Sequence, residues 1–198
     1  MSIFLRALFV AVFVAWCLPA SATEMAAQSP TPRVGDTWKW ENTATGMTGE
    51  DTVTAVDSTT VTVSSRYANG NVGGYTLDRN LNLTELRRAA WVLTYGTMHP
   101  YPLVSFPLYV GKTWEDSFVS AKGRNYTVTH AVVAYETITA PFGAVMVYRI
   151  KAEHVAADPG ANGAEEVLYA PELGYVVAHR ATSGWKEDWR MTSFTHGH

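Results

Sequence analysis

Apolar and polar residues alternate along most of the chain from residue 34 onward. In TTVTVSSRY (59–67), Val61, Val63 and Tyr67 fall on one face, and polar residues fall on the other. VMVYRIKAEH (145–154) shows the same period of two, with Tyr148 and Ile150 on the apolar face. This alternation is typical of half-buried antiparallel strands.

Glycine and proline divide these runs into short segments. The stretch HPYPLVSFP (99–107) contains three prolines, which cannot donate to a sheet ladder, so it predicts an irregular crossover. The composition of LTELRRAAWVLTY (83–95) permits a helix. We favour two strands there, because apolar and polar residues alternate toward its end and Pro100 follows closely.

One short phrase occurs twice: VGDTW at 34–38 and VGKTW at 110–114. Thr-rich stretches with the strand pattern follow both copies. We therefore predict two related halves, 34–98 and 110–198, joined by the proline-rich link 99–109. Coincidence within a strand-rich composition is the alternative. The predicted fold is all-β, with one domain at 34–198: a single curved antiparallel sheet forming a half-barrel or an open barrel.

The first 22 residues have the pattern of a cleaved export signal. Arg6 precedes an apolar run, and Ala20-Ser21-Ala22 fits the small-residue cleavage rule. A membrane anchor and a lipid on Cys17 are the alternatives. The run is short for a spanning helix and is broken by Pro19, and bulky Trp16 fits a lipid signal badly. We expect a periplasmic or secreted protein without a membrane span after cleavage, which begins with a flexible lead-in at 23–33.

Charge and motifs exclude several classes of function. The net charge of −3 comes without a basic stripe, so nucleic acid is not an expected partner. No nucleotide-binding loop, nucleophile elbow or close metal-ligand pair is present, so no cofactor, metal or catalytic residue is predicted and the chain is expected not to be an enzyme. The carboxylates, Glu165 among them, are most simply assigned to charged strand faces or loops.

The histidines give a weak signal. His130, His154 and His179 lie on predicted strands of the second half, and on neighbouring strands their imidazoles would converge. Isolated histidines in sheets are more often hydrogen-bonded than used as ligands. His196 and His198, in the terminal sequence THGH, are expected to form a frayed tail, and a loose transition-metal site is the alternative.

Aromatic residues carry the remaining functional hypothesis. A curved sheet with an aromatic inner face can bind a lipid or another apolar ligand, and it can equally pack its own core. The candidate ligand-binding residues are Trp38, Trp40, Trp114, Tyr148, Trp185 and Trp189. The function expected is non-enzymatic binding of a hydrophobic small molecule. The alternative is a cell-envelope assembly factor that contacts an envelope protein through its sheet edges.

Three motifs occur in the order FPLYVGKTW (106–114), ITAPFGAVMVYRI (138–150) and VLYAPELGYVVAHR (167–180). In this order they resemble small exported bacterial β-proteins of the domain-of-unknown-function 3108 and TapB-like kind. The resemblance covers about residues 106–181, and it departs from the family pattern at Leu168 and Ala178, where Trp and Lys are usual. It implies an open, curved antiparallel sheet and no catalytic residues.

Overall fold

The described part of the chain folds into one antiparallel sheet of twelve strands. The structure is a computed structural model that describes residues 26–88, 91–94, 101–120, 123–157, 162–183 and 188–197 of the 198. The strands are β1 (Thr37–Asn42), β2 (Thr48–Val56), β3 (Thr60–Tyr67), β4 (Val72–Asp78), β5 (Leu83–Arg88), β6 (Trp91–Thr94), β7 (Thr113–Val119), β8 (Asn125–Ala140), β9 (Gly143–Ala156), β10 (Gly163–Ala170), β11 (Tyr175–Ser183) and β12 (Trp189–Thr195).

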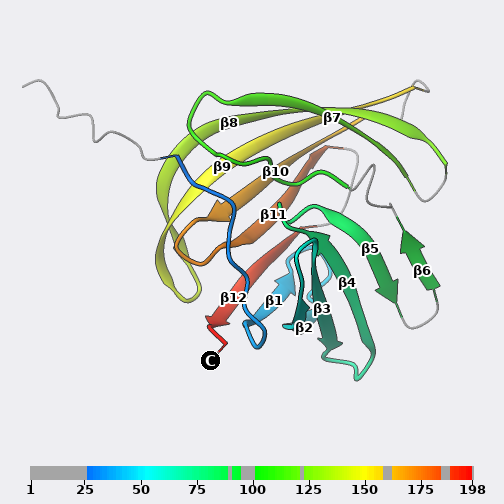
Figure 1. Ribbon diagram of the computed structural model, residues 1–198, viewed down its shortest axis with the longest axis vertical. Helices are drawn as coiled ribbons and strands as arrows, with labels where there is room; N and C mark the ends of the chain where they lie inside the picture. The colour runs from blue at the N-terminus through cyan, green and yellow to red at the C-terminus, as the bar shows by residue number, and fades with distance from the viewer. Residues whose placement is uncertain are drawn as a thin grey trace, which may run out of the picture.

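The strand order is β6-β5-β4-β3-β2-β1-β12-β11-β10-β9-β8-β7. Two six-stranded meanders therefore meet where β1 pairs with β12, and β6 and β7 form the two ends of the order. The sheet curves strongly, so that the long strands β8 and β9 arch over the opposite side formed by β2, β3 and β4 (Figure 1). This confirms the predicted all-β fold and its curved antiparallel sheet, and the sheet is open.

Register shifts help to bend the sheet. They fall between Lys39 and Trp40 in β1, between Val132 and Ala134 in β8, and between Leu168 and Tyr169 in β10. A bulge adds one residue to one strand of a pair, which bends that strand and increases its twist. Strands as long as β8 and β9 can therefore curve around a core while keeping their pairing.

Residues 83–95, whose composition is compatible with a helix, form strands. Glu85 pairs with Thr94, and Arg87 pairs with Val92, across the hairpin of β5 and β6. Ala89, Ala90 and Tyr95 lie outside the described residues. Within the described ranges, no helix has the length and apolar character needed to cross a bilayer.

The two copies of the repeated phrase adopt the same turn. Gly35 and Gly111 both have positive φ, 92° and 90°, which glycine accepts without strain. In the first copy the Gly35 N–H donates to Val53, and in the second the Gly111 N–H donates to Val132. Each turn thus ties the start of one strand to a later strand of the same meander. The wider division into halves at 34–98 and 110–198 stays a prediction.

An irregular segment, residues 101–109, covers part of the inner face of the sheet, and we call it the crossover. In Figure 1 it runs inside the curve of the sheet toward the start of β7. Tyr101 exchanges two backbone hydrogen bonds with Leu83 of β5, and Leu108 exchanges two with Ala27 of the lead-in. Val104 and Leu108 are fully buried. The crossover therefore occupies space that an open half-barrel would otherwise leave for a ligand.

The core lies between the two meanders and under the crossover. Trp38 of β1 is only 5% exposed, and its ring lies 4.8 Å from that of Tyr175. Ile150 of β9 and Tyr169 of β10 are also buried in this core, as the period of two predicts. On β9 and its neighbours, the residues that alternate with them are more exposed.

The C-terminal end of the chain is held by a buried carboxylate. Asp36 accepts hydrogen bonds from the N–H of Gly197 at 2.8 Å, from the hydroxyl of Tyr175 at 2.7 Å and from the N–H of Arg33 at 2.9 Å. Burial raises the pKa of Asp36, but these hydrogen bonds outweigh it and lower the pKa below its usual value. The expectation of a frayed tail is therefore wrong for residues 196 and 197, while His198 lies outside the described residues.

Replacing Asp36 by alanine is expected to lower the free energy of unfolding by about 2 kcal/mol, because three donors lose a charged acceptor. Urea denaturation at neutral pH measures this. Glu172→Ala, at an exposed turn position, is the matched control and should change stability by less than about 0.5 kcal/mol. Equal stability of Asp36→Ala and the unaltered protein would contradict this role of the Asp36 carboxylate.

Candidate functional site

The most unusual group of side chains is a set of buried polar residues on the inner face of the second meander. Glu165 of β10 is 4% exposed. Its Oε1 lies 3.1 Å from Nε2 of His154, and its Oε2 lies 2.5 Å from Nε2 of His179. One carboxylate therefore connects three neighbouring strands. We call His130, His154, Glu165, His179 and Tyr101 the histidine–glutamate cluster.

The strand register explains this convergence. Glu165 lies opposite Ala152 of β9, and His154 is two residues further along β9. Residues two apart in a strand point to the same face, so His154 is the diagonal neighbour of Glu165. Gly163 lies directly opposite His154 and has no side chain to compete for the space. His179 reaches Glu165 from β11, where it lies opposite Val167.

The crossover contributes the fourth member of the cluster. The hydroxyl of Tyr101 donates a 2.9 Å hydrogen bond to Oε2 of Glu165, the same oxygen that His179 contacts. The ring of Tyr101 stacks 6.2 Å from His154 and contacts Phe118 edge-on at 4.8 Å. The side chain of Tyr101 therefore connects the crossover to the buried charge of the sheet.

His130 of β8 is the fifth member of the cluster, and it stacks on an aromatic ring instead of contacting the Glu165 carboxylate. It is 1% exposed and stacks nearly parallel on Trp114, with ring centroids 4.5 Å apart. Neither of its ring nitrogens has a hydrogen-bond partner among the described residues. Leaving buried polar atoms without partners is energetically unfavourable. The chain therefore keeps a titratable group in a position that a plain core would fill with an apolar side chain.

The electrostatics of the cluster follow from burial and from the balance of charges. Burial raises the pKa of Glu165, but the hydrogen bonds and charges of His154 and His179 outweigh it and lower the pKa to about 2. The pKa of His130 is lowered to about 4, chiefly by burial, which Glu165 opposes and His154 reinforces. At neutral pH, Glu165 is therefore ionised and His130 is neutral.

The cluster is closed to solvent, and its geometry does not resemble a metal centre. Within the part of the chain that the structure describes, no group of three or more His, Cys, Asp or Glu side chains is arranged to hold a metal ion. His154, Glu165 and His179 are each at least nine-tenths buried. Such an arrangement can hold a charge, respond to protons and anchor a neighbouring segment.

The aromatic residues proposed from the sequence separate into groups. Trp38 and Tyr148 are buried in the core, and Trp40 donates a 2.9 Å hydrogen bond to the buried carboxylate of Asp51. Trp114 stacks on His130, and Trp189 stacks 6.4 Å from His179, so these two border the histidine–glutamate cluster. Trp185 lies outside the described residues. The six therefore do not form one continuous surface among the described residues.

Sequence reasoning misses Glu165 and Tyr101. The assignment of Glu165 to an exposed face or a loop is wrong, because Glu165 is buried. The signal is present in GAEEVLYA, where Glu165 alternates in phase with the buried Val167 and Tyr169. Tyr101 gives no comparable signal, because it lies in a proline-rich segment without periodicity and its partner is 64 residues away. Convergence of the histidines is an open possibility in the sequence, and the structure places His154 and His179 on one carboxylate.

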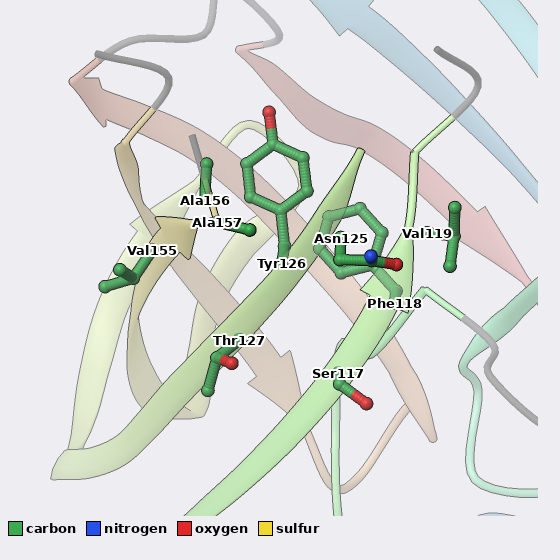
Figure 2. A pocket seen from close by; sticks show the side chains of 9 residues that line it. All are labelled: Ser117, Phe118, Val119, Asn125, Tyr126, Thr127, Val155, Ala156 and Ala157. Carbon is green, nitrogen blue, oxygen red and sulfur yellow. The ribbon is translucent and has the colours of Figure 1, made fainter. Parts of the chain in front are cut away.

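A hollow of about 370 Å³ lies at the end of β7, β8 and β9 (Figure 2). Most of its lining residues are exposed and belong to the outer face, among them Ser117 and Thr127. Figure 2 shows these two pointing away from the rings of Phe118 and Tyr126. Those two rings pack with Tyr101 in a second small apolar cluster. Phe118 lines the hollow and also contacts Tyr101 and His154 of the histidine–glutamate cluster edge-on. The hollow contains no charged side chain.

No protein-family model matches the chain, and no curated protein is similar to it in sequence. Two solved structures are similar in fold. One is a presumed exported protein with a YmcC-like fold from Bacteroides fragilis, at 15% identity and a TM-score of 0.46, covering 86% of this chain and 100% of that one. The other is a presumed lipoprotein from Parabacteroides distasonis, at 11% identity and a TM-score of 0.45, covering 87% and 100%. Similarity this low carries no argument about function.

Proposed function

We propose that the chain is an exported, non-enzymatic binding protein that takes an apolar, acyl-chain type of ligand on the inner face of its sheet. The observation that carries the proposal is that an irregular segment, the crossover, covers an apolar part of that face. Val104 and Leu108 of the crossover pack there in the same core cluster as Val132 and Ile150 of the sheet. If the crossover moved away, Val132 and Ile150 would form part of an apolar surface to which an acyl chain can bind.

The crossover is held to the rest of the fold by fewer backbone hydrogen bonds than the strands are. Within the described residues it forms isolated bridges rather than a continuous ladder, at Leu83–Tyr101 and Ala27–Leu108. Asn82 Oδ1 accepts hydrogen bonds from the N–H groups of Leu103 and Val104, at 2.8 and 3.0 Å. Segments with few ladder hydrogen bonds open locally at a smaller free energy than sheet strands do. Displacing the crossover therefore leaves the sheet in place.

The edge of the sheet at β7 favours this proposal over a partner that adds a strand. Asp116 lies half-buried on the inward face of β7, and burial raises its pKa. Inward-pointing charges on an edge strand are a device that natural proteins use against edge-to-edge pairing. The export itself rests on the leader-like pattern of residues 1–22.

Titration with a dansyl-labelled fatty acid tests the proposal, because dansyl fluorescence rises on transfer to an apolar site. We expect saturable binding, and we expect Asn82→Ala to bind about tenfold more tightly, because a loosened crossover is displaced at lower cost. Asn71→Ala, at an exposed turn position, is the matched control and should bind like the unaltered protein. Absence of saturable binding in both the unaltered protein and Asn82→Ala would contradict the proposal.

A further inference from the structure

The histidine–glutamate cluster contains three histidines but only one carboxylate, that of Glu165. Each oxygen of Glu165 already has a contact: Nε2 of His154 lies 3.1 Å from Oε1, and both His179 and Tyr101 contact Oε2. One carboxylate can compensate one imidazolium. A protonated His130 would add a positive charge, stacked on Trp114 rather than on a carboxylate, in a volume that is closed to water. The cluster is therefore stable at neutral pH and unfavourable in acid.

Other titratable groups around His130 do not remove this imbalance. From β7, Asp116 lies on the inward face two residues from Trp114. Burial raises the pKa of Asp116, so it takes up a proton as the pH falls and then offers no compensating charge. The ammonium of Lys112 lies 5.2 Å from the centre of the Trp114 ring and donates to the carbonyl of Pro107. Lys112 is a cation, so it cannot compensate a protonated imidazole.

The direction of the pH effect can be worked out from His130. In the unfolded chain it binds a proton near its ordinary pKa of 6.5, whereas in the folded chain burial lowers that pKa to about 4. Between these two values the unfolded or opened state binds more protons, so acid favours opening. Glu165 also favours opening at lower pH. Its ionised form stabilises the folded state, and this contribution is lost as the pH falls from 4.5 toward about 2. Asp116 acts in the opposite direction, since its raised pKa favours the folded state in acid.

The cluster is connected to the crossover through Tyr101. Its hydroxyl depends on the ionised Oε2 of Glu165, and its ring rests against His154 and Phe118. His130 lies opposite Ala152, two residues from His154 along β9, so its protonation would place a charge beside the residues on which Tyr101 rests. The pairing of β8, β9 and β10 is made by backbone groups and does not depend on these side chains. We propose that the histidine–glutamate cluster is an acid-operated latch, which holds the crossover on the inner face at neutral pH and releases it in acid. The latch rests on the proposed function and deepens it, because the face that it uncovers is the proposed ligand site.

Thiol labelling of Val104→Cys tests the latch without any ligand. Val104 is 1% exposed, and the sole native cysteine, Cys17, lies in the predicted leader. A dipyridyl disulfide is the probe, since it reacts with thiols in acid, and Thr129→Cys on the exposed outer face is the reference. From about pH 7 to about pH 4.5, we expect the labelling rate of the thiol at position 104, relative to that at position 129, to rise at least about tenfold. The far-UV circular dichroism should stay unchanged over this range.

Two variants at His130 decide whether the cluster causes the release. With His130→Phe or His130→Leu in the Val104→Cys background, the acid-dependent rise should fall below about twofold, because the titrating group is gone. His196→Asn, which alters an exposed histidine outside the cluster, should keep the full rise. A rise that survives both His130 changes, the absence of any rise, or a rise that coincides with loss of the strand signal would each overturn the latch. Because no ligand is present, failure here leaves the fatty-acid titration as an independent test of the proposed function.

Discussion

Replacing Glu165 by glutamine will lower the free energy of unfolding at neutral pH by about 4 kcal/mol, the largest effect expected of a change that keeps side-chain size. The carboxylate is 4% exposed and is contacted by His154, His179 and Tyr101. An amide presents one acceptor oxygen and an NH₂ group, so it cannot serve all three. Removing one partner of a buried charged network leaves the others with uncompensated polar atoms, which is why the effect is large.

Urea denaturation followed by circular dichroism measures this change. Glu153→Gln is the matched control, because Glu153 lies on β9 next to His154 but is exposed on the outer face. It should change stability by less than about 0.5 kcal/mol. If Glu165→Gln were as stable as Glu153→Gln, the cluster would not contribute to the fold, and the proposed latch would lose its basis.

Replacing Trp38 by alanine will lower the free energy of unfolding by about 4 kcal/mol. Trp38 is a candidate ligand residue in the sequence, yet it is buried in the core against Tyr175 at a ring distance of 4.8 Å. Truncating a buried tryptophan removes its transfer free energy and leaves a cavity that neighbours fill only in part. Trp38 is therefore expected to stabilise the fold, and its role in ligand binding stays a prediction.

Tyr109→Ala is the control for Trp38, since Tyr109 is an aromatic residue that is 47% exposed. Tyr109→Ala should lower the free energy of unfolding by less than about 1 kcal/mol in the same denaturation experiment. A Trp38→Ala protein of nearly unchanged stability with weaker fatty-acid binding would assign Trp38 to the ligand site instead.

Local patterns in the sequence predict the strands because burial on one face of a sheet imposes a period of two. The same rule places Tyr148, Ile150 and His154 on the inner face of β9, as the structure has them. In 83–95, the alternation that ends with Tyr95 outweighs a composition compatible with a helix, and the segment forms β5 and β6.

Contacts between distant segments cannot be predicted in the same way. The Tyr101–Glu165 hydrogen bond joins residues 64 apart, and the Asp36–Gly197 hydrogen bond joins residues 161 apart. Both depend on how the sheet curves and on where the crossover passes, and neither property has a local periodic signature. The candidate site therefore emerges from the three-dimensional structure, although its histidines are recognisable on the strands.

Binding and latch together describe one sequence of events. At neutral pH, the hydrogen bond from Tyr101 to Glu165 favours the state in which the crossover covers the inner face of the sheet. A ligand must then displace the crossover to reach the apolar face. In acid, the crossover is held less tightly on the inner face, so a smaller free energy is needed to expose that face. The two proposals therefore predict that ligand affinity rises as the pH falls, as long as the sheet remains folded.

Native mass spectrometry of the untagged protein, exported from a bacterial host, is the most direct test of the central claim. A tag is omitted so that nothing added to the chain competes with the ligand. We predict a population that carries an added mass in the range of an acyl-chain lipid, which disappears after extraction with organic solvent. A bare protein mass that gains no adduct, even after incubation with fatty acids at neutral and acidic pH, would contradict the claim that this fold binds an apolar ligand.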